Sequence, residues 1–341
     1  MADYSRGDAR DWARENMKGI CGCLLPTLST SLRAVNEAAV RHDVRLSAGF
    51  GYWGTLLVPE CGTTDDEMRE VMDIAVDEAE KSGIRTMLLA SFPTLEVTKE
   101  MIGYAESVGV DMVMTSYPAT FRPRSERDVY DFTRELCGAS DLGVMLFAIH
   151  HWDFERLHPS GFSSQLIEDL VNDCETVVAI KNEVGRPGVG GQAEVFARFN
   201  DRVVVSDPFE ENAPAWTSTY GMEFMGTANY EYFGRELVDY FDLLQDGDLD
   251  GAMKLYWKLQ PARLASKNLT VQTMAGTNLV HRLMWKYKGW LNGFNGGPTR
   301  GPQARLLQSQ MNTLRGALVQ SGIAPAPGED DDFFIGRNPM E

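Results

Sequence analysis

Apolar and polar segments alternate regularly along the first two thirds of the chain. Short, mostly apolar runs typical of buried strands are separated by amphipathic segments with apolar positions three or four residues apart, typical of helices. The expected strands lie near residues 20–25, 55–58, 84–90, 111–115, 143–149, 176–181, 202–206 and 222–227. The helices expected between them lie near 33–48, 64–81, 95–108, 124–138, 160–173, 190–199 and 209–219. This unbroken alternation predicts an α/β fold, a (β/α)8 TIM barrel.

A doubly wound sheet is the alternative arrangement of the same elements. Its dinucleotide-binding version requires a Gly-x-Gly-x-x-Gly turn after the first strand, and the sequence has none there. The local helix signals suit either fold. The segment Thr63 to Glu67, for example, offers a Thr or Asp N-cap with acidic residues in the first turn.

The pattern becomes purely helical after residue 228. Helices are expected over 231–245, 249–266, 271–290 and 301–320, with breaks at 245–248 and 267–270. We therefore divide the chain into a helical arm (1–17), a barrel (18–228), a C-terminal helical region (229–322) and an acidic, Pro-rich tail (323–341). We expect that tail to lie on a neighbouring molecule or to stay mobile.

Composition narrows the class of protein. The 341 residues are 43% hydrophobic and 24% charged, which is enough for a large buried core. Neither an 18-residue apolar run nor the apolar region of a signal peptide is found, so we expect a cytoplasmic protein. A net charge of -17 excludes nucleic acid and anionic membranes as partners. The five cysteines lack zinc or thioredoxin spacing, and we expect reduced thiols.

The strongest chemical signal is a lysine at the end of an expected strand. Residues 176–180 are uncharged and mostly β-branched, Lys181 follows them, and a Gly-rich segment lies at 186–191. In a parallel α/β fold the C-terminal strand ends carry the ligand site, where a desolvated lysine can attack a carbonyl and form a Schiff base. The alternative is a lysine that reaches solvent or pairs with Glu183.

Several short motifs, and their order along the chain, resemble those of the dihydrodipicolinate synthase / N-acetylneuraminate lyase family of class I aldolases. The sixth strand ends in Ile180-Lys181 with Gly185 close behind, and Leu25-Pro26-Thr27 resembles the end of the family's first strand. The segment Pro59 to Thr63 resembles part of the loop after its second strand, and Gly221 with Thr227-Ala228-Asn229 is similar to its eighth strand. The resemblance covers residues 18–290.

The resemblance implies a fold, a chemistry and an assembly. Lys181 would form an imine with the 2-oxo carbon of pyruvate or a related 2-oxo acid. No external cofactor is needed, because the protonated imine is itself the electron sink. Family members are commonly homotetramers or homodimers, so a homo-oligomer is expected here.

Two departures from the family pattern concern its proton relay. The tyrosine that ends the family's fifth strand is replaced by Phe147, which has no proton to give. The Thr-Thr pair of the second loop is also missing, since residues 56–60 read Leu-Leu-Val-Pro-Glu. A dihydrodipicolinate synthase or sialic acid lyase of the usual kind is therefore not expected.

His150 and His151 are the candidates to replace that relay. They follow the fifth strand, and histidine titrates near neutrality, so one of them could move protons at the imine. Adjacent strand residues point to opposite faces, so we expect at most one to face the barrel mouth, while the other packs or hydrogen-bonds outside. The alternative is that both are structural or only bind substrate. The remaining histidines have no ligand spacing, and no metal site is assigned.

Further pocket candidates follow from position near strand ends or from the family motifs. Each has an ordinary structural alternative: a loop carboxylate that binds backbone N–H groups, a buried thiol, or an aromatic residue that packs in the core. The expected substrate-binding residues are Glu60, Cys61, Tyr117, Phe147, Glu183, Asp207, Thr227 and Tyr230. Trp152 and Trp53 are added as apolar walls suited to an aromatic substrate, and Phe121 follows the fourth strand close to Tyr117.

The predicted function is a class I lyase acting on a 2-oxo acid. The aromatic loops and the missing relay favour a pyruvate-releasing, hydratase-aldolase-like enzyme with a bulky or aromatic aldehyde as second partner. A dehydratase or decarboxylase using the same imine is the first alternative. A non-catalytic protein that binds a 2-oxo acid is the second.

Overall fold

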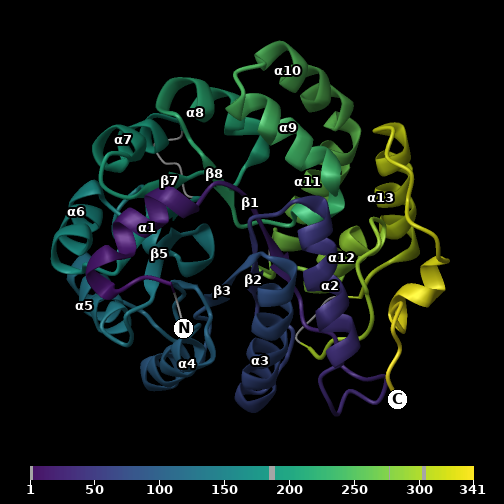
Figure 1. The fold of residues 1–341 in the computed structure, drawn as a ribbon, viewed down its shortest axis with the longest axis horizontal. Helices are drawn as coiled ribbons and strands as arrows, with labels where there is room; N and C mark the ends of the chain where they lie inside the picture. Colours follow the sequence, from purple (N-terminus) through teal and green to yellow (C-terminus); the bar gives the residue numbers. More distant parts are fainter. Residues whose placement is uncertain (1–2, 184–188, 276, 302–304) are drawn as a thin grey trace. The chain divides into compact units, whose positions relative to one another are not determined.

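The computed structural model describes residues 3–183, 189–275, 277–301 and 305–341. Eight parallel strands form one sheet in the order β7-β6-β5-β4-β3-β2-β1-β8, and helices separate them along the chain (Figure 1). This is the predicted (β/α)8 TIM barrel, nearly closed and followed by C-terminal helices. The order excludes the doubly wound alternative. Part of the Gly-rich segment, residues 186–188, lies outside the described residues.

The strands fall close to their predicted positions. Their bounds are β1 Gly19–Leu24, β2 Gly54–Leu57, β3 Arg85–Leu89, β4 Met112–Met114, β5 Gly143–Ala148, β6 Val177–Asn182, β7 Val204–Ser206 and β8 Phe224–Gly226. The barrel helices are α2 Glu37–Phe50, α3 Asp65–Ser82, α4 Leu95–Val108, α5 Glu126–Cys137, α6 Ser164–Asp173, α7 Val189–Phe199 and α8 Ala213–Tyr220. The other helices are α1 Ala9–Asn16, α9 Arg235–Gln245, α10 Leu249–Lys258, α11 Gln260–Met274, α12 Arg282–Trp290 and α13 Gln308–Gln320.

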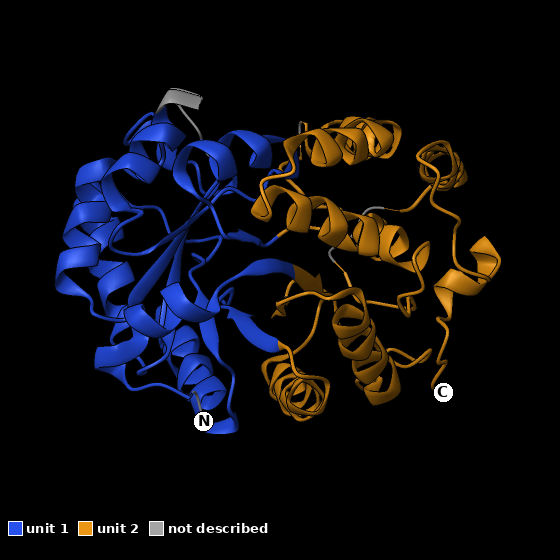
Figure 2. Ribbon diagram, turned by 45° about the horizontal axis from the view of Figure 1, so that its top comes forward, with its two compact units in different colours: residues 1–21, 85–227 blue, residues 22–84, 228–341 orange. Residues whose placement is uncertain are grey.

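Residue contacts divide the chain into two compact units. Unit 1 comprises residues 1–21 and 85–227, and unit 2 comprises residues 22–84 and 228–341 (Figure 2). In unit 1, β3 to β7 pair in sequence and the start of β1 pairs with β8. Ser206 links β7 to β8, since its hydroxyl donates to the Gly226 carbonyl at 3.0 Å and accepts from the Gly226 N–H at 3.2 Å.

The N-terminal arm anchors the starts of two strands of unit 1. Arg10, in α1, donates to the carbonyl oxygens of Val177 at 2.9 Å and Cys174 at 2.8 Å, where β6 begins. The hydroxyl of Tyr4 accepts from the Gly143 N–H at 2.7 Å, where β5 begins. These bonds satisfy backbone groups at the N-terminal end of the sheet, so the opposite strand ends are left to build a site.

The start of α3 was predicted to within one residue, because a capping box marks it. Thr64 accepts from the Glu67 N–H at 3.2 Å, while the Glu67 carboxylate accepts from the Thr64 N–H at 2.8 Å. This capping box starts α3 at Asp65, as the sequence indicated.

The C-terminal helices differ from the prediction in four places. The expected helix over 271–290 is interrupted, because α11 ends at Met274 and α12 begins at Arg282. The expected helix over 249–266 is divided, because α11 begins at Gln260 with a proline in its first turn. The expected break at 267–270 is helical and lies inside α11. Helix α13 starts only at Gln308, not at residue 301. The spacing of apolar residues can stay helical where one helix ends and the next begins. That spacing alone therefore does not locate the helix ends.

The acidic tail is packed against its own unit, and this corrects the expectation of a mobile or neighbour-bound segment. Phe333 is fully buried, and the Arg337 guanidinium lies 3.9 Å from the centre of the Trp290 ring. Asp330 accepts from the Tyr287 hydroxyl at 2.7 Å. Composition indicated disorder, but burial of the Phe333 side chain favours an ordered tail.

Two further sequence expectations concern thiols and membrane spans. All five cysteines are free and buried, which confirms the prediction of reduced thiols. In the part of the chain that the structure describes, no helix has both the length and the hydropathy needed to cross a bilayer.

Candidate active site

Lys181 is buried at the C-terminal end of β6, with 3% of its surface exposed. Its Nζ lies 2.8 Å from Oε1 of Glu183 and donates to the Thr227 hydroxyl at 3.2 Å. The ring of Phe147 covers it, with 3.9 Å between Nζ and the ring centre. The amine is thus held by one carboxylate and one hydroxyl against an aromatic face, in a site largely closed to water.

Strand pairing brings these groups together. In the parallel register of β5 and β6, Phe147 stands beside Lys181 and Ala148 beside Asn182. The N–H of Glu183 then donates to the Ala148 carbonyl at 2.9 Å, so the chain is still tied to β5 one residue after the strand ends. The backbone therefore fixes the position of the Glu183 side chain next to the lysine.

Thr227 follows β8 and is 2% exposed. Its hydroxyl accepts a hydrogen bond from Lys181 and makes its own contact with the Met114 sulfur at 3.7 Å. Because Met114 ends β4, this contact joins the ends of β4, β6 and β8. Met114 has no signal in the sequence beyond its place in an apolar run.

An aromatic cluster extends from Phe147. The rings of Phe147 and Trp152 meet edge to face with 5.0 Å between their centres, and Trp152 meets Tyr117 at 4.8 Å. The Tyr117 hydroxyl lies 2.5 Å from the Thr133 hydroxyl, and burial raises the pKa of Tyr117. Tyr117 is therefore a packed wall residue whose polar end is satisfied, while Trp152 is only partly buried.

The two histidines do not lie in a strand. Strand β5 ends at Ala148, and residues His150–Trp152 form a short 3-10 helix, η2. The expectation that the pair would point to opposite faces of a strand is therefore wrong, since the period-two rule applies only within the strand. His150 is about half exposed, and its Nδ1 is bonded to the Glu155 carboxylate; His151 is half-buried.

Asp207 follows β7 and uses its carboxylate to hold its own loop. It accepts from the indole N–H of Trp216 at 2.6 Å, the Asn212 amide at 2.9 Å and the Phe209 N–H at 2.8 Å. Burial raises its pKa, and the negative charge of Glu183 adds to the increase. Three donors on one carboxylate indicate a loop anchor more than a substrate contact.

Three of the predicted substrate-binding residues belong to unit 2, where each one is ion-paired or buried. Glu60 forms an ion pair with Arg282. Cys61 is buried, which raises the pKa of its thiol to about 11. Tyr230 lies in a short 3-10 helix and is 2% exposed. None of these three side chains is placed as a reactive group. The carboxylate is ion-paired, the thiol has a raised pKa and the tyrosine ring is buried.

Unit 2 also contains buried charges that the sequence did not reveal. Lys286 donates to the Thr27 hydroxyl at 2.6 Å, and burial lowers its pKa to about 8. Burial lowers the pKa of Lys288 to about 7 and raises that of Glu231 to about 7. Lys286 and Lys288 are two positions apart in α12, so they lie on opposite faces of the helix. Both lysines are buried because both faces of α12 are covered, and no local sequence pattern predicts that burial.

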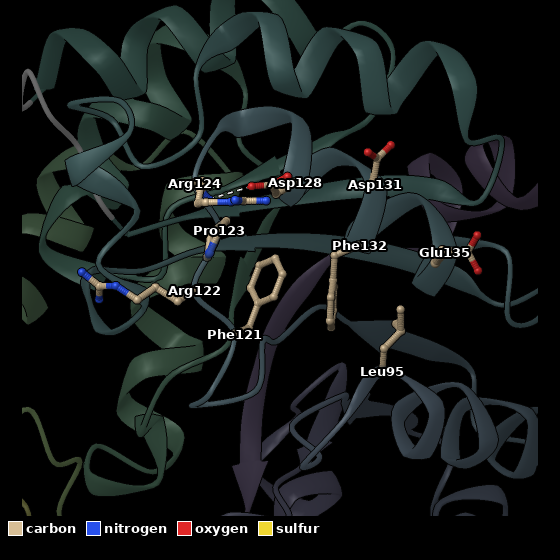
Figure 3. A pocket seen from close by; sticks show the side chains of 9 residues that line it. All are labelled: Leu95, Phe121, Arg122, Pro123, Arg124, Asp128, Asp131, Phe132 and Glu135. Atoms are coloured by element: carbon tan, nitrogen blue, oxygen red, sulfur yellow. Dashed lines mark hydrogen bonds between the residues drawn. The ribbon is translucent and has the colours of Figure 1, made fainter.

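Unit 1 also carries an open cleft beside α5, separate from the residues around Lys181. It has a volume of about 430 Å³, and its floor is formed by Phe121 and Phe132, whose ring centres are 4.6 Å apart (Figure 3). The other lining residues are Leu95, Arg122, Pro123, Arg124, Asp128, Asp131 and Glu135. Phe121 thus belongs to this cleft. Among the described residues, no group of three or more His, Cys, Asp or Glu side chains is placed to hold a metal ion.

The fold is shared with solved enzyme structures. The chain is 16% identical to the 4-hydroxy-tetrahydrodipicolinate synthase of Methylacidiphilum fumariolicum SolV, with a TM-score of 0.74 over 89% of this chain and 96% of that one. It is 18% identical to N-acetylneuraminate lyase from Fusobacterium nucleatum, with a TM-score of 0.70 over 89% and 98%. It is 15% identical to dihydrodipicolinate synthase from Oceanobacillus iheyensis, with a TM-score of 0.74 over 93% of this chain and 99% of that one.

No protein-family model matches the sequence, and a search of curated proteins returned no match. Identities this low show the fold and do not by themselves show the reaction.

Proposed function

We propose that the chain is a class I, Schiff-base-forming lyase that acts on a 2-oxo acid, with Lys181 as the nucleophile. The observation that carries this proposal is the buried amine of Lys181 at the C-terminal end of β6, 2.8 Å from a carboxylate and 3.2 Å from a hydroxyl. In barrels of this kind the reactive groups stand at that end of the strands. The shared fold with a synthase and a lyase supports the same conclusion.

The contacts suit each step of imine formation. Glu183 can take a proton from the Lys181 ammonium, and the neutral amine then attacks the 2-oxo carbon. Loss of water from the resulting carbinolamine gives a protonated imine. Breaking the bond between C3 and C4 places its electron pair in an enamine, the C4 hydroxyl gives its proton to a base at the aldehyde end of the site, for which His150 is proposed below, and an aldehyde leaves. The Phe147 ring stabilises the nitrogen in its two positively charged forms, the ammonium and the protonated imine.

The finer proposal is a pyruvate-releasing, hydratase-aldolase-like reaction with a bulky or aromatic aldehyde. Phe147, Trp152 and Tyr117 form a continuous aromatic surface that begins at the lysine. An aryl group stacks on such a surface at little entropic cost. The histidines of η2 adjoin Trp152, so we propose that His150, oriented by Glu155, moves protons at the aldehyde end of the substrate.

The proposal is tested by trapping the imine. The protein is incubated with pyruvate and sodium borohydride, which reduces an imine to a stable secondary amine, and the adduct is located by intact-mass measurement and peptide mapping. A pyruvyl adduct on Lys181 is expected. No adduct with pyruvate, nor with phenyl-substituted 2-oxo acids, on the folded protein would overturn the assignment.

A further inference from the structure

We propose that Glu183 is the base that removes the C3 proton from the imine of Lys181. In this role it replaces the tyrosine hydroxyl that the fifth strand lacks at Phe147. The inference rests on the proposed function, because it requires an imine at Lys181. It assigns the proton transfer to a residue two positions after the nucleophile on the same strand end.

The geometry places a carboxylate where the reaction needs one. Oε1 of Glu183 is 2.8 Å from the Lys181 nitrogen, and the side chain of Glu183 is 16% exposed. After imine formation C2 is bonded to that nitrogen and C3 is the next atom. An oxygen at hydrogen-bond distance from the nitrogen is therefore within reach of the hydrogens on C3. The hydrogen bond from the Glu183 N–H to Ala148 keeps the carboxylate there.

The neighbouring side chains are less suited to this transfer. Phe147 has no lone pair to accept a proton, and the Thr227 hydroxyl is a far weaker base than a carboxylate near neutral pH. The carboxylate of Asp207 already accepts hydrogen bonds from three donors. His150 is about half exposed and bonded to Glu155. The Glu183 carboxylate, in contrast, forms an ion pair with the reacting nitrogen itself.

The step is balanced without any further reactant. The C3–H bond breaks and its proton goes to the Glu183 carboxylate. The electron pair of that bond forms the C2–C3 double bond, and the π electrons of the protonated imine move to nitrogen, giving a neutral enamine. In the reverse direction protonated Glu183 returns the proton to C3 and restores the imine, which water then releases as the 2-oxo acid.

Pyruvate in D2O tests this step without knowledge of the second substrate. Each cycle of deprotonation and reprotonation replaces methyl hydrogens of pyruvate with deuterium, and proton NMR measures the loss. With borohydride trapping run to its end point, Glu183→Gln should still form the Lys181 adduct to within about threefold of wild type, because water can take the ammonium proton more slowly, while exchange relative to adduct formation falls at least about 100-fold, the range of general base catalysis. Glu183→Asp should recover part of the exchange, with a changed pH profile.

Glu175→Gln is the matched control. It makes the same chemical change at an exposed residue just before β6, and it should leave exchange unchanged. Exchange by Glu183→Gln within about tenfold of wild type would overturn the inference. A folded Glu183→Gln protein that forms no adduct would also overturn it, because the carboxylate would then act on Lys181 alone. A wild-type protein that forms no adduct refutes the proposed function instead.

Discussion

The Lys181 ammonium and the Glu183 carboxylate form an ion pair of 2.8 Å at the end of β6, although the two residues are only two positions apart. Glu183 lies one residue beyond β6, but its N–H still donates to the Ala148 carbonyl at 2.9 Å, so the pairing with β5 continues and both side chains reach the same site. The sequence offered this pair as the ordinary alternative to a catalytic lysine. In the proposed reaction the same arrangement supplies a base, because the carboxylate that pairs with the buried lysine can also accept its proton.

Replacing the nucleophile tests the assignment most directly. Lys181→Met should abolish the borohydride adduct and lower pyruvate exchange by at least about 10³-fold, because no other step can substitute for imine formation. It should also lower stability by about 1–3 kcal/mol, since Glu183 loses its partner. Lys181→Arg keeps the ion pair without a usable nucleophile, so it should be inactive but more stable than Lys181→Met. Activity in either variant would contradict the mechanism.

Thr227→Val removes a hydroxyl while nearly conserving shape. The hydroxyl accepts from Lys181 at 3.2 Å, and a hydrogen bond to a charged group contributes about 1.5–3 kcal/mol. We expect the rate of adduct formation to fall about tenfold or more, and the melting temperature to fall by a few degrees, because the same hydrogen bond stabilises the fold. Thr227→Ser, which keeps the hydroxyl, should stay near wild type. Equal rates for the Val and Ser variants would show that the contact does not position the amine.

Phe147→Tyr restores the residue expected at the end of the fifth strand. The ring is buried against Trp152, and the Thr-Thr pair that would orient a new hydroxyl is missing. We therefore expect no gain in pyruvate exchange and a loss of about 1–3 kcal/mol from an unsatisfied hydroxyl. The same change should not rescue Glu183→Gln. A rescued double variant would mean that the tyrosine relay can still operate in this site.

Trp152→Ala tests the aromatic surface. Trp152 touches both Phe147 and Tyr117, and its loss should weaken binding of an aryl-substituted 2-oxo acid about tenfold or more, while pyruvate is affected little. The measurement is the concentration dependence of borohydride trapping for the two acids. Trp152→Phe should retain most of the preference. An equal loss for both acids would argue that the surface does not contact the aryl group.

Glu231 makes stability depend on pH. Burial raises its pKa to about 7 in the folded protein, against an ordinary value near 4.5 in the unfolded chain. The folded state therefore binds this proton more tightly, and its contribution is fully present below about pH 4.5 and lost as the pH rises to about 7. The size of this effect is about 3 kcal/mol.

Glu231→Gln should remove that part of the dependence, as measured by urea unfolding between pH 5 and 8. Glu80→Gln, at an exposed position in α3 of the same unit, is the control and should follow wild type. A Glu231→Gln curve parallel to wild type would show that the carboxylate does not titrate in this range.

Much of the fold followed from local patterns. The strand and helix alternation, the cap at Thr64 and the lysine at the end of β6 are all within a few residues of their predicted positions. Prediction was less successful where contacts between residues far apart in the sequence override what the local composition indicates. The tail was expected to be mobile on its composition, but Phe333 and Arg337 pack on the helices of unit 2.

The sequence by itself determined the barrel and placed an amine at the C-terminal end of its sixth strand, because the periodicity of apolar positions and the end of a strand are local properties. Only the tertiary structure decided which groups meet that amine. The pairing of β5 with β6 put Phe147 over Lys181, and the turn of η2 placed His150 beside Glu155 instead of in a strand. Such encounters depend on register and on loop paths between distant segments, and these are fixed by packing of the whole chain.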